Sequence, residues 1–369
     1  MTLSEIIIEK IRKEGPISFR DFMEMSLYYP GLGYYTSSED KIGKSGDYYT
    51  SPYFTHIFGE IIGRQLEEIW SALYGLDKKE FTIVEYGAGM GSLCHDILNY
   101  LKKQTELYKK LHYYIIEKSA VMQEKEKMIL NEKVSWFDSI HDIPKITGCI
   151  LSNEVVDNFS VHQVVMEEEL MEVFVDYNNG FVETLKPASA VLKDYMNHLN
   201  VVLPKGFRTE INLQAIDWIK EIASALEKGF VITIDYGYPS SELYSMRRNS
   251  GTLLCYNKHN INDCPYSNIG KQDITAHVNF SALYYWGLKY GLEYCGFTTQ
   301  AYFLLALGLA DHLRKMEESG KYDHINDKEK AFFIRTLLMD MGSKLKVLVQ
   351  QKGIRQPELS GLKFSQQLH

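Results

Sequence analysis

The sequence has few cysteines, and their spacing forms no recognisable pattern. Its five cysteines are scattered over 369 residues without a C-x-x-C pair. An odd number without a framework predicts reduced thiols in a reducing compartment. The histidines also lack metal-ligand spacing, so no metal site is expected.

Long apolar runs and an excess of positive charge are missing as well. The longest apolar stretch, residues 301–310, is too short for a membrane-spanning helix, which needs about 20 residues, so no membrane insertion is expected. The net charge is −8 and the pI about 5.8, which argues against nucleic acid as a partner. Residues 1–15 carry acids and no apolar segment, so no secretory signal is expected there.

What the sequence does contain is an alternation of β-rich runs and helical segments from residue 80 onward. This alternation predicts an α/β fold with a doubly wound, mostly parallel sheet. The expected strands are 81–86, 113–117, 149–152, 230–236 and 251–256, with helices at 92–103 and 119–131.

Further regions are expected around this sheet. The Gly-, Ser- and Tyr-rich stretch 29–52 is long and lacks periodicity, which predicts a functional loop or lid. An Asn-Asn-Gly turn between alternating runs predicts a β-hairpin inserted into the α/β core. The predicted regions are N-terminal helices and lid at 1–75, a core at 76–158 and 206–310, an insertion at 159–205, and a C-terminal helical segment packed on the core at 311–369.

The turn after the first strand is rich in glycine and reads E85-x-G87-x-G89-x-G91. Glycine at every second position removes Cβ atoms and permits unusual φ angles where a ligand passes close to the backbone. The next helix would point its N-terminus at polar groups of that ligand. A dinucleotide fingerprint, G-x-G-x-x-G, has glycine or alanine at the position where this chain has Ser92, so Ser92 departs from that pattern. The pattern therefore favours S-adenosylmethionine (SAM), with a nicotinamide dinucleotide and an oxidoreductase as the alternative.

A second acid is expected at the end of the neighbouring strand, where a carboxylate can accept hydrogen bonds from both ribose hydroxyls. Glu117, which closes the run Y-Y-I-I-E, lies there. The glycine turn alone is equally consistent with an ordinary tight turn. Glu117 shifts the interpretation towards a cofactor site.

Asn153, Glu154 and Asp157 follow the strand 149–152 and are predicted to face the same site. Two carboxylates would suit a cationic acceptor such as a guanidinium, and would help to remove the proton lost on methylation. The alternative is that both acids only cap the element that follows.

Three other groups of residues have two interpretations each. Arg208 and Glu210 form either a site or a structural ion pair. Asp235 ends a strand, and its loop is either part of the active edge or a β-turn. His277 is a candidate base, although an isolated histidine is more often structural.

Together the motifs resemble the MidA-like family of SAM-dependent methyltransferases, the family of the complex I assembly arginine methyltransferases. The matching segments follow in order from about residue 15 to 364. They include Y29-P-G-L-G-Y-Y, S45-G-D-Y-Y-T-S-P, E85-Y-G-A-G-M-G, S152-N-E-V-V-D, R208-T-E, D273-I-T-A-H-V-N-F and M341-G-S-K-L-K-V-L.

The resemblance implies a Rossmann-like class I methyltransferase sheet with a helical N-terminal lid and an inserted β-hairpin that serves the substrate. It also implies SAM as cofactor and a protein arginine as acceptor, with symmetric dimethylation in the 49-kDa subunit of respiratory complex I as the family role. The expected catalytic residues are Glu154, Asp157 and His277. The expected cofactor-binding residues are Gly46, Asp47, Thr50, Ser51, Pro52, Glu85, Gly87, Ala88, Gly89, Gly91, Glu117, Lys118, Phe137, Asp138, Asn153 and Glu154.

The chain departs from the family pattern at two places. Ala88 and Met90 replace the usual proline and arginine of the glycine turn, and N-E-V-V-D-N-F-S stands where N-E-F-F-D-A-L-P is usual. The second change keeps an alternative open, a methyltransferase-like assembly factor that binds SAM and client without turnover. The expected compartment is the cytoplasm for a bacterial chain and the mitochondrial matrix for a eukaryotic one. A homodimer is an open expectation.

Overall fold

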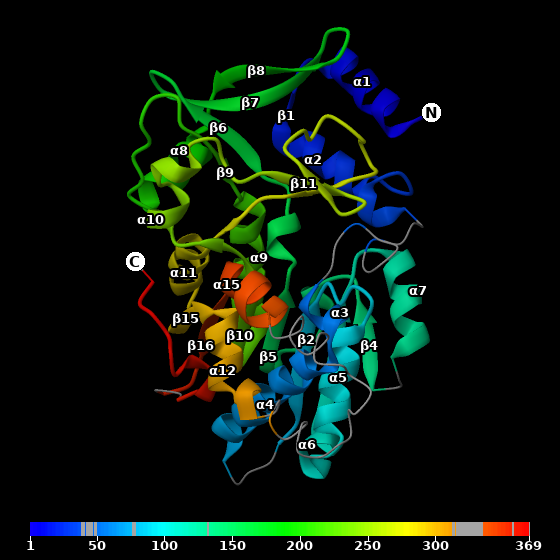
Figure 1. Cartoon of the computed structure of the whole chain (residues 1–369), viewed down its shortest axis with the longest axis vertical. Helices are drawn as coiled ribbons and strands as arrows, with labels where there is room; N and C mark the ends of the chain where they lie inside the picture. Colours follow the sequence, from blue (N-terminus) through cyan, green and yellow to red (C-terminus); the bar gives the residue numbers. More distant parts are fainter. Residues whose placement is uncertain are drawn as a thin grey trace.

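The computed structural model describes residues 1–37, 41, 47, 50–75, 79–130, 133–311, 314, 335–355 and 358–368, without the side chains of 53 and 54. Within these ranges no helix combines the length and the apolar character that crossing a membrane requires. A main sheet with helices on both faces occupies the lower part of Figure 1, and a smaller second sheet with α1 and α2 lies above it.

Two capped helices open the chain. Helix α1 (Leu3–Glu14) begins after Thr2, whose side chain accepts a hydrogen bond from the backbone N–H of Glu5 in a capping box. Helix α2 (Phe19–Tyr28) begins after Ser18, which caps the N–H of Asp21 at 3.1 Å. The short α3 (Ser51–Phe54) and the long α4 (His56–Tyr74) follow.

The main sheet confirms the predicted α/β fold. Five of its strands are parallel neighbours in the order β10-β5-β2-β3-β4, and β16 and β15 extend the β10 edge in antiparallel fashion. Their bounds are β2 Phe81–Tyr86, β3 Leu111–Ile116, β4 Val134–Phe137, β5 Ile146–Asn153, β10 Leu226–Tyr238, β15 Glu293–Thr299 and β16 Leu345–Lys352, with the short β14 (Val278–Asn279) beside β10.

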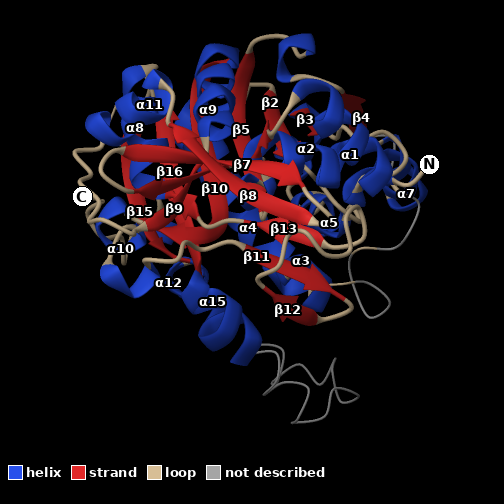
Figure 2. Cartoon of the chain, turned by 90° about the horizontal axis from the view of Figure 1, so that it is seen from above, coloured by secondary structure: helices blue, strands red, loops and turns tan. Residues whose placement is uncertain are grey.

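Helices cover both faces of this sheet, as the view from above in Figure 2 shows. Ile83 packs with α4 and with α5 (Ser92–Leu101), whereas its neighbour Val84 faces the opposite core, which contains α9 (Leu213–Ala225) and α11 (Phe280–Lys289). Successive residues of a strand point to opposite faces, so strands buried on both sides are apolar throughout. The remaining described helices are α6 Thr105–Lys110, α7 Ala120–Ile129, α8 Ala190–His198, α10 Ser240–Leu243, α12 Gln300–Ala306 and α15 Met341–Lys344, with a π-helical segment at Arg335–Asp340.

The predicted hairpin is present in the second sheet. Strands β7 (Leu170–Tyr177) and β8 (Phe181–Pro187) pair antiparallel around the Asn-Asn-Gly turn, where Asn179 has a φ of 55°. The strand order is β1-β7-β6-β9, with β8 on the other side of β7, and this sheet shares a core with α1 and α2. The other strands are β1 (Ile17–Ser18), β6 (His162–Met166) and β9 (Arg208–Ile211). The sheet thus recruits segments on both sides of the predicted insertion 159–205, whose exact bounds stay a prediction.

Two expectations about strands differ from the structure. The run 251–256 does not join the main sheet, because β11 (Leu254–Asn257) pairs with β12 (Asn260–Asn262) and β13 (Asp273–Thr275) in a separate three-stranded sheet. The C-terminal region is not purely helical, because β16 lies between β10 and β15. Most of β16 is buried on both faces, and the resulting apolar run has no strand periodicity to distinguish it from a helix.

Candidate functional site

The site lies at the carboxyl ends of the central parallel strands. Strand β2 is paired with β3 on one side and β5 on the other. The chain runs from β2 to β3 and β4 and then returns to β5 on the opposite side of β2, so the strand order reverses its direction at β2. Tyr86 is aligned with Ser152, and Asn153 with Ile234 of β10, so the segments after these strands meet at one edge. Such a switch point is where open α/β sheets bind ligands.

The glycine turn adopts the backbone conformation that the sequence predicts. Gly87, Gly89 and Gly91 have φ angles of 60°, 61° and 76°, a left-handed region that glycine enters without a steric penalty. A Cβ on Gly87 would approach Cγ2 of Val155 to 3.0 Å. The turn ends at the N-terminus of α5, whose free N–H groups favour polar or anionic ligand groups.

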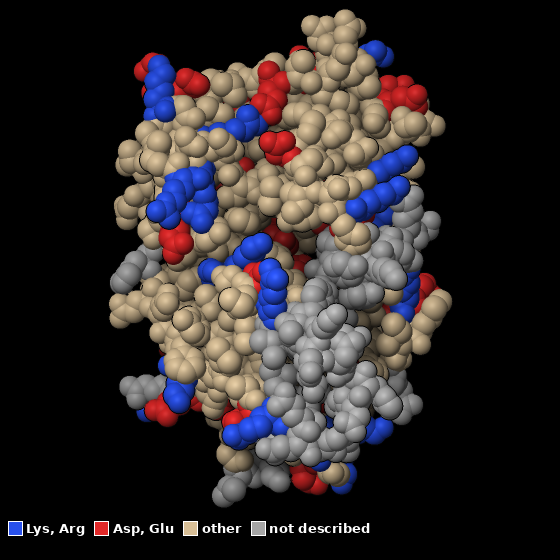
Figure 3. Space-filling model, in the orientation of Figure 1, with Lys and Arg blue, Asp and Glu red and all other residues tan. Residues whose placement is uncertain are grey.

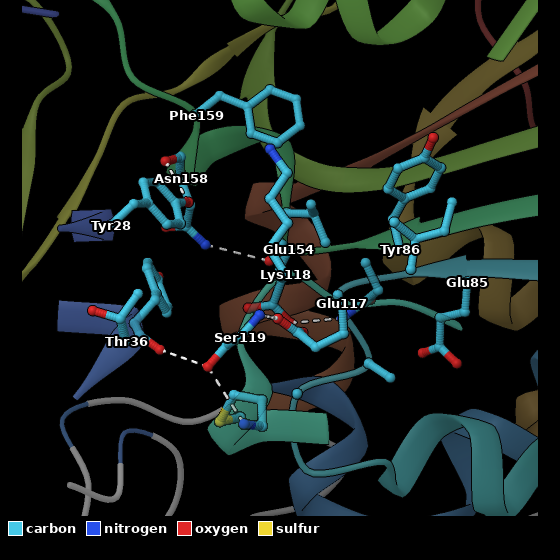
Figure 4. Close-up of a pocket in the computed structure, with 18 of the residues that line it drawn as sticks. Tyr28, Thr36, Glu85, Tyr86, Glu117, Lys118, Ser119, Glu154, Asn158 and Phe159 are labelled. Carbon is cyan, nitrogen blue, oxygen red and sulfur yellow. Dashed lines mark hydrogen bonds between the residues drawn. The ribbon is translucent and has the colours of Figure 1, made fainter. Parts of the chain in front are cut away.

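A cavity of about 900 Å³ opens beside this turn. This volume is in the range of small-molecule and cofactor sites, about 300–1,000 Å³. Its walls come from the glycine turn, the ends of β3 and β5, α2 and α9. Figure 3 shows acidic atoms in the hollow between the second sheet and the main sheet. In Figure 4, Phe159 lies above Glu154 in the view, Tyr86 lies to its right and Ser119 lies below it.

Two carboxyls, the buried Glu85 and the partly buried Glu117, border the cavity on the side of the glycine turn. Glu85 accepts a 2.6 Å hydrogen bond from the hydroxyl of Tyr113, and burial raises the pKa of Glu85 to about 7. Glu117 accepts a 2.7 Å hydrogen bond from the N–H of Ser119, and burial also raises its pKa. The carboxyl group of Glu117 has more lone pairs than this one hydrogen bond uses, so it can also accept from a ligand hydroxyl.

Glu154 also lines the cavity, and its backbone has an unusual conformation. Its φ is 56°, which is rare outside glycine and carries a cost of about 1–3 kcal/mol. Its Oε1 accepts from the N–H of Ser51 at 3.3 Å and from Nδ2 of Asn153 at 3.2 Å. Burial, with a smaller effect from the charge of Asp235, raises the pKa of Glu154 to about 8. The strained backbone thus holds a carboxyl of variable charge at the cavity wall.

Three more buried acids lie behind Glu154. Asp235 at the end of β10 accepts hydrogen bonds from the N–H groups of Val155 and Val156, at 3.2 and 2.8 Å. Asp273 accepts from the hydroxyl of Tyr35 at 2.8 Å. Burial raises the pKa values of Asp235 and Asp273 to about 7. Asp157 has an Oδ1 without a partner among the described residues, and burial beside the other acids raises its pKa strongly.

Comparison with known proteins assigns the family. Residues 61–298 match the model of a family described as "Putative S-adenosyl-L-methionine-dependent methyltransferase". The crystal structure of a Burkholderia thailandensis protein bound to S-adenosyl-homocysteine (SAH) has 28% sequence identity and a TM-score of 0.88, and covers 98% of this chain and 95% of its own. The chain belongs to this family of SAM-dependent methyltransferases.

Two relatives carry more specific names. A Caenorhabditis elegans protein, "Protein arginine methyltransferase NDUFAF7 homolog, mitochondrial", is 27% identical over 93% of this chain and 85% of its own length. The human "Protein arginine methyltransferase NDUFAF7, mitochondrial" is 28% identical over 75% of this chain and 67% of its own length. Both names place those proteins in mitochondria.

The residues around the methyltransferase cavity fit SAM. Side chains are disfavoured in the glycine turn, because its φ angles are positive and a Cβ at Gly87 would crowd Val155. A ligand can therefore approach the backbone of the turn closely. Glu117, at the tip of the adjacent strand, offers oxygens for hydroxyl groups, and Asp138 and Ile140 add a polar and an apolar contact next to it. Within the described residues no cluster of His, Cys, Asp or Glu has the arrangement of a metal site.

Most of the predicted cofactor residues come together in this cavity. The roles themselves stay predictions. Those that line it are Thr50, Pro52, Glu85, Gly87, Ala88, Gly89, Glu117, Lys118, Asp138, Asn153 and Glu154. Ser51 lies directly behind and binds Glu154 through its N–H. Gly46 lies outside the described residues.

Other predicted residues do not line the cavity. Gly91 is the N-cap of α5, and a Cβ on it would lie 3.3 Å from Leu130. Phe137 packs against Tyr114, with ring centroids 5.1 Å apart. Asp47 uses its carboxylate inside the protein, accepting from the hydroxyl of Tyr34 at 2.7 Å and the N–H of Lys258 at 2.5 Å. These contacts support the fold around the site and leave the carboxylate of Asp47 engaged.

Two of the three predicted catalytic residues lie outside the cavity wall as well. Asp157 is in the acid cluster behind Glu154. His277 packs on Tyr238, and burial together with the charges of Arg248 and Lys346 lowers its pKa to about 4. His277 is therefore neutral at neutral pH, with a buried Nδ1 that has no partner among the described residues.

Sequence reasoning missed the helical wall of the cavity and part of the acid cluster. Asp235 and Asp273 each belong to a sequence motif, but nothing in the sequence indicates that Asp235 approaches Glu154 or that both approach Asp157. The residues of α2 and α9 that line the cavity carry a weak signal, because polar and aromatic residues on one helix face usually indicate only an amphipathic helix. The ion-pair interpretation of Arg208 needs one change, since its partner is Glu183 at 2.6 Å, while Glu210 binds Thr252.

Proposed function

We propose that the chain transfers the methyl group of SAM to an arginine side chain of a protein. The observation that carries this proposal is the position of Glu154, a partly buried carboxyl on the wall of the cavity that also contains the glycine turn. The names of the C. elegans and human relatives support the same acceptor. A carboxylate binds a guanidinium through parallel hydrogen bonds, which would fix the acceptor nitrogen in place.

Bound SAM supplies an activated methyl group on a sulfonium. Glu154 would orient the guanidinium towards it and accept the proton that the nitrogen loses as the new N–C bond forms, while the S–C bond breaks. A pKa of about 8 leaves Glu154 mostly protonated in the free protein at neutral pH, and an approaching guanidinium favours its ionised form. Ser51 and Asn153, which hydrogen-bond Oε1, would keep the carboxylate in position.

The proposal extends to the client as a finer hypothesis. By analogy with the relatives' family, the client would be a subunit of respiratory complex I or a similar protein, and the product would be symmetric dimethylarginine. A eukaryotic chain would then act in the mitochondrial matrix and a bacterial one in the cytoplasm.

The proposal is tested by incubating the protein with isotopically labelled SAM and cell lysate, followed by mass spectrometry of the lysate proteins. Labelled monomethyl- or dimethylarginine is the expected result. SAH binding in calorimetry without any methylated arginine would contradict arginine transfer and favour a SAM-binding assembly factor. Label on another residue type would support methyl transfer but contradict arginine as the acceptor.

A further inference from the structure

The cavity extends past Glu154 along one face of helix α9. The lining residues on α9 are spaced at i, i+3, i+4 and i+7, which places them on a single helix face. From α2, two residues four positions apart form the facing wall. The residues of this helical limb are Gln214, Asp217, Trp218 and Glu221 on α9, and Glu24 and Tyr28 on α2.

Negative charge is concentrated in this limb. Asp217 is exposed and forms no ion pair with another described residue. Glu221 has one long contact, 3.9 Å from its Oε1 to Nε2 of His141. Like charges four residues apart destabilise a helix by about 0.2–0.5 kcal/mol. A bound cation between Asp217 and Glu221 would remove that repulsion.

A second observation in the same limb points to a ligand. Trp218 is 5% exposed, and its indole Nε1 is a buried donor without a partner among the described residues. The ring lies edge-on to Tyr86, with centroids 5.6 Å apart, and edge-on to Phe159 at 6.0 Å. The hydroxyl of Tyr86 is buried and unpartnered as well. Indole N–H is only a donor, and Trp218 is among the residues that line the cavity. Because Nε1 itself is covered, the indole ring must shift for this donor to reach an acceptor such as a peptide carbonyl.

We propose that this face of α9 binds a peptide segment in which a basic residue neighbours the target arginine. Asp217 and Glu221 pair with the basic side chain, and Nε1 of Trp218 donates a hydrogen bond to a backbone carbonyl. The inference rests on the proposed function for the arginine at Glu154, whereas peptide binding itself requires no turnover.

The test uses two fluorescein-labelled synthetic peptides, one with Lys-Arg and one with Ala-Arg between glycines, titrated with the protein in saturating SAH at low salt. Fluorescence anisotropy should show about fivefold tighter binding of the Lys-Arg peptide, since exposed ion pairs are individually weak and screened by salt. The double variant Asp217→Asn/Glu221→Gln should lose this preference. The matched control Asp194→Asn, an exposed acid on α8 away from the cavity, should keep it.

Trp218→Phe keeps the aromatic ring and removes the donor. It should weaken both peptides by about threefold to tenfold, the value of one hydrogen bond in binding. Equal affinities of the two peptides for the unmodified protein would overturn the proposal, and so would a lysine preference that survives in the double variant. A thermal shift with SAH reports the fold of each variant separately.

Methyl transfer from labelled SAM to the same peptides separates this inference from the function on which it rests. Charge-dependent binding without any label would support the peptide surface and refute arginine methylation. Label on both peptides without a preference would support the methyltransferase and refute the role of α9.

Discussion

The two walls of the cavity are built in different ways. The wall at the glycine turn consists of backbone and of acids at strand ends, all within residues 85–154. The helical wall consists of side chains from α2 and α9, which are almost two hundred residues apart in the chain. The wall at the glycine turn is defined by local sequence and suits an invariant ligand such as a cofactor. The helical wall depends on tertiary packing and suits an acceptor whose sequence varies. If cofactor and acceptor divide between these walls, substitutions in one wall should change SAH binding and substitutions in the other should change acceptor binding.

The largest effect is expected for Gly89→Val in the glycine turn. A β-branched residue at a φ of 61° is strained, and its side chain would occupy the cavity. SAH affinity in calorimetry should fall by at least about 100-fold, beyond what strain alone explains. The control is Gly206→Val, which has a φ of 80° and open space around the Cβ. It should show similar destabilisation with SAH affinity retained. Normal affinity of Gly89→Val would refute the cofactor wall.

Glu154→Gln should separate the two walls at their junction. Glutamine keeps the shape and the acceptor for Ser51 but loses the charge and the ability to take a proton. We expect kcat for arginine methylation to fall about 100-fold, within the range of general acid–base catalysis, with SAH affinity nearly unchanged. Glu210→Gln is a control, because this buried acid of β9 in the second sheet binds Thr252 and does not line the cavity. Full turnover by Glu154→Gln would remove Glu154 from the mechanism.

The different construction of the two walls also explains what the sequence could predict. The strand ends at Glu85, Glu117 and Asn153 and the turn between them follow from local patterns of apolar runs and glycine. Strand β16 was missed because burial on both sides removes its periodicity. The second sheet was underestimated because Ser18 of β1 pairs with Phe174 of β7, a long-range contact that no local pattern contains.

The acids near the two walls differ in burial as well. Glu126 of α7 is fully buried, accepts a 2.6 Å hydrogen bond from Nε1 of Trp136, and has its pKa raised by burial to about 8, whereas Asp217 is exposed. Between pH 4.5 and 8 the unfolded chain ionises this group while the folded protein keeps it protonated. Folding stability is therefore present below the unfolded pKa and is lost as pH rises through the folded one.

Glu126→Gln should abolish this loss, because glutamine is neutral at every pH. Urea denaturation should show the variant more stable than the unmodified protein by about 4 kcal/mol at pH 8.5, with little difference at pH 4.5. An equal difference at both pH values would mean that Glu126 is already ionised in the folded protein.

The smallest effect is expected for Glu117→Gln, which tests the cofactor wall at a single hydrogen bond. The side-chain oxygen of glutamine can still accept from the N–H of Ser119, as Oε1 of Glu117 does at 2.7 Å, but the second oxygen becomes an NH₂ group that only donates. One ribose hydroxyl would lose its acceptor, so SAH affinity in calorimetry should fall about fivefold. Binding of the Lys-Arg peptide in saturating SAH should stay the same, the opposite of the result expected for Asp217→Asn/Glu221→Gln. If Glu117→Gln weakened the peptide as much as SAH, cofactor and acceptor would share this wall, and the division between the two walls would be wrong.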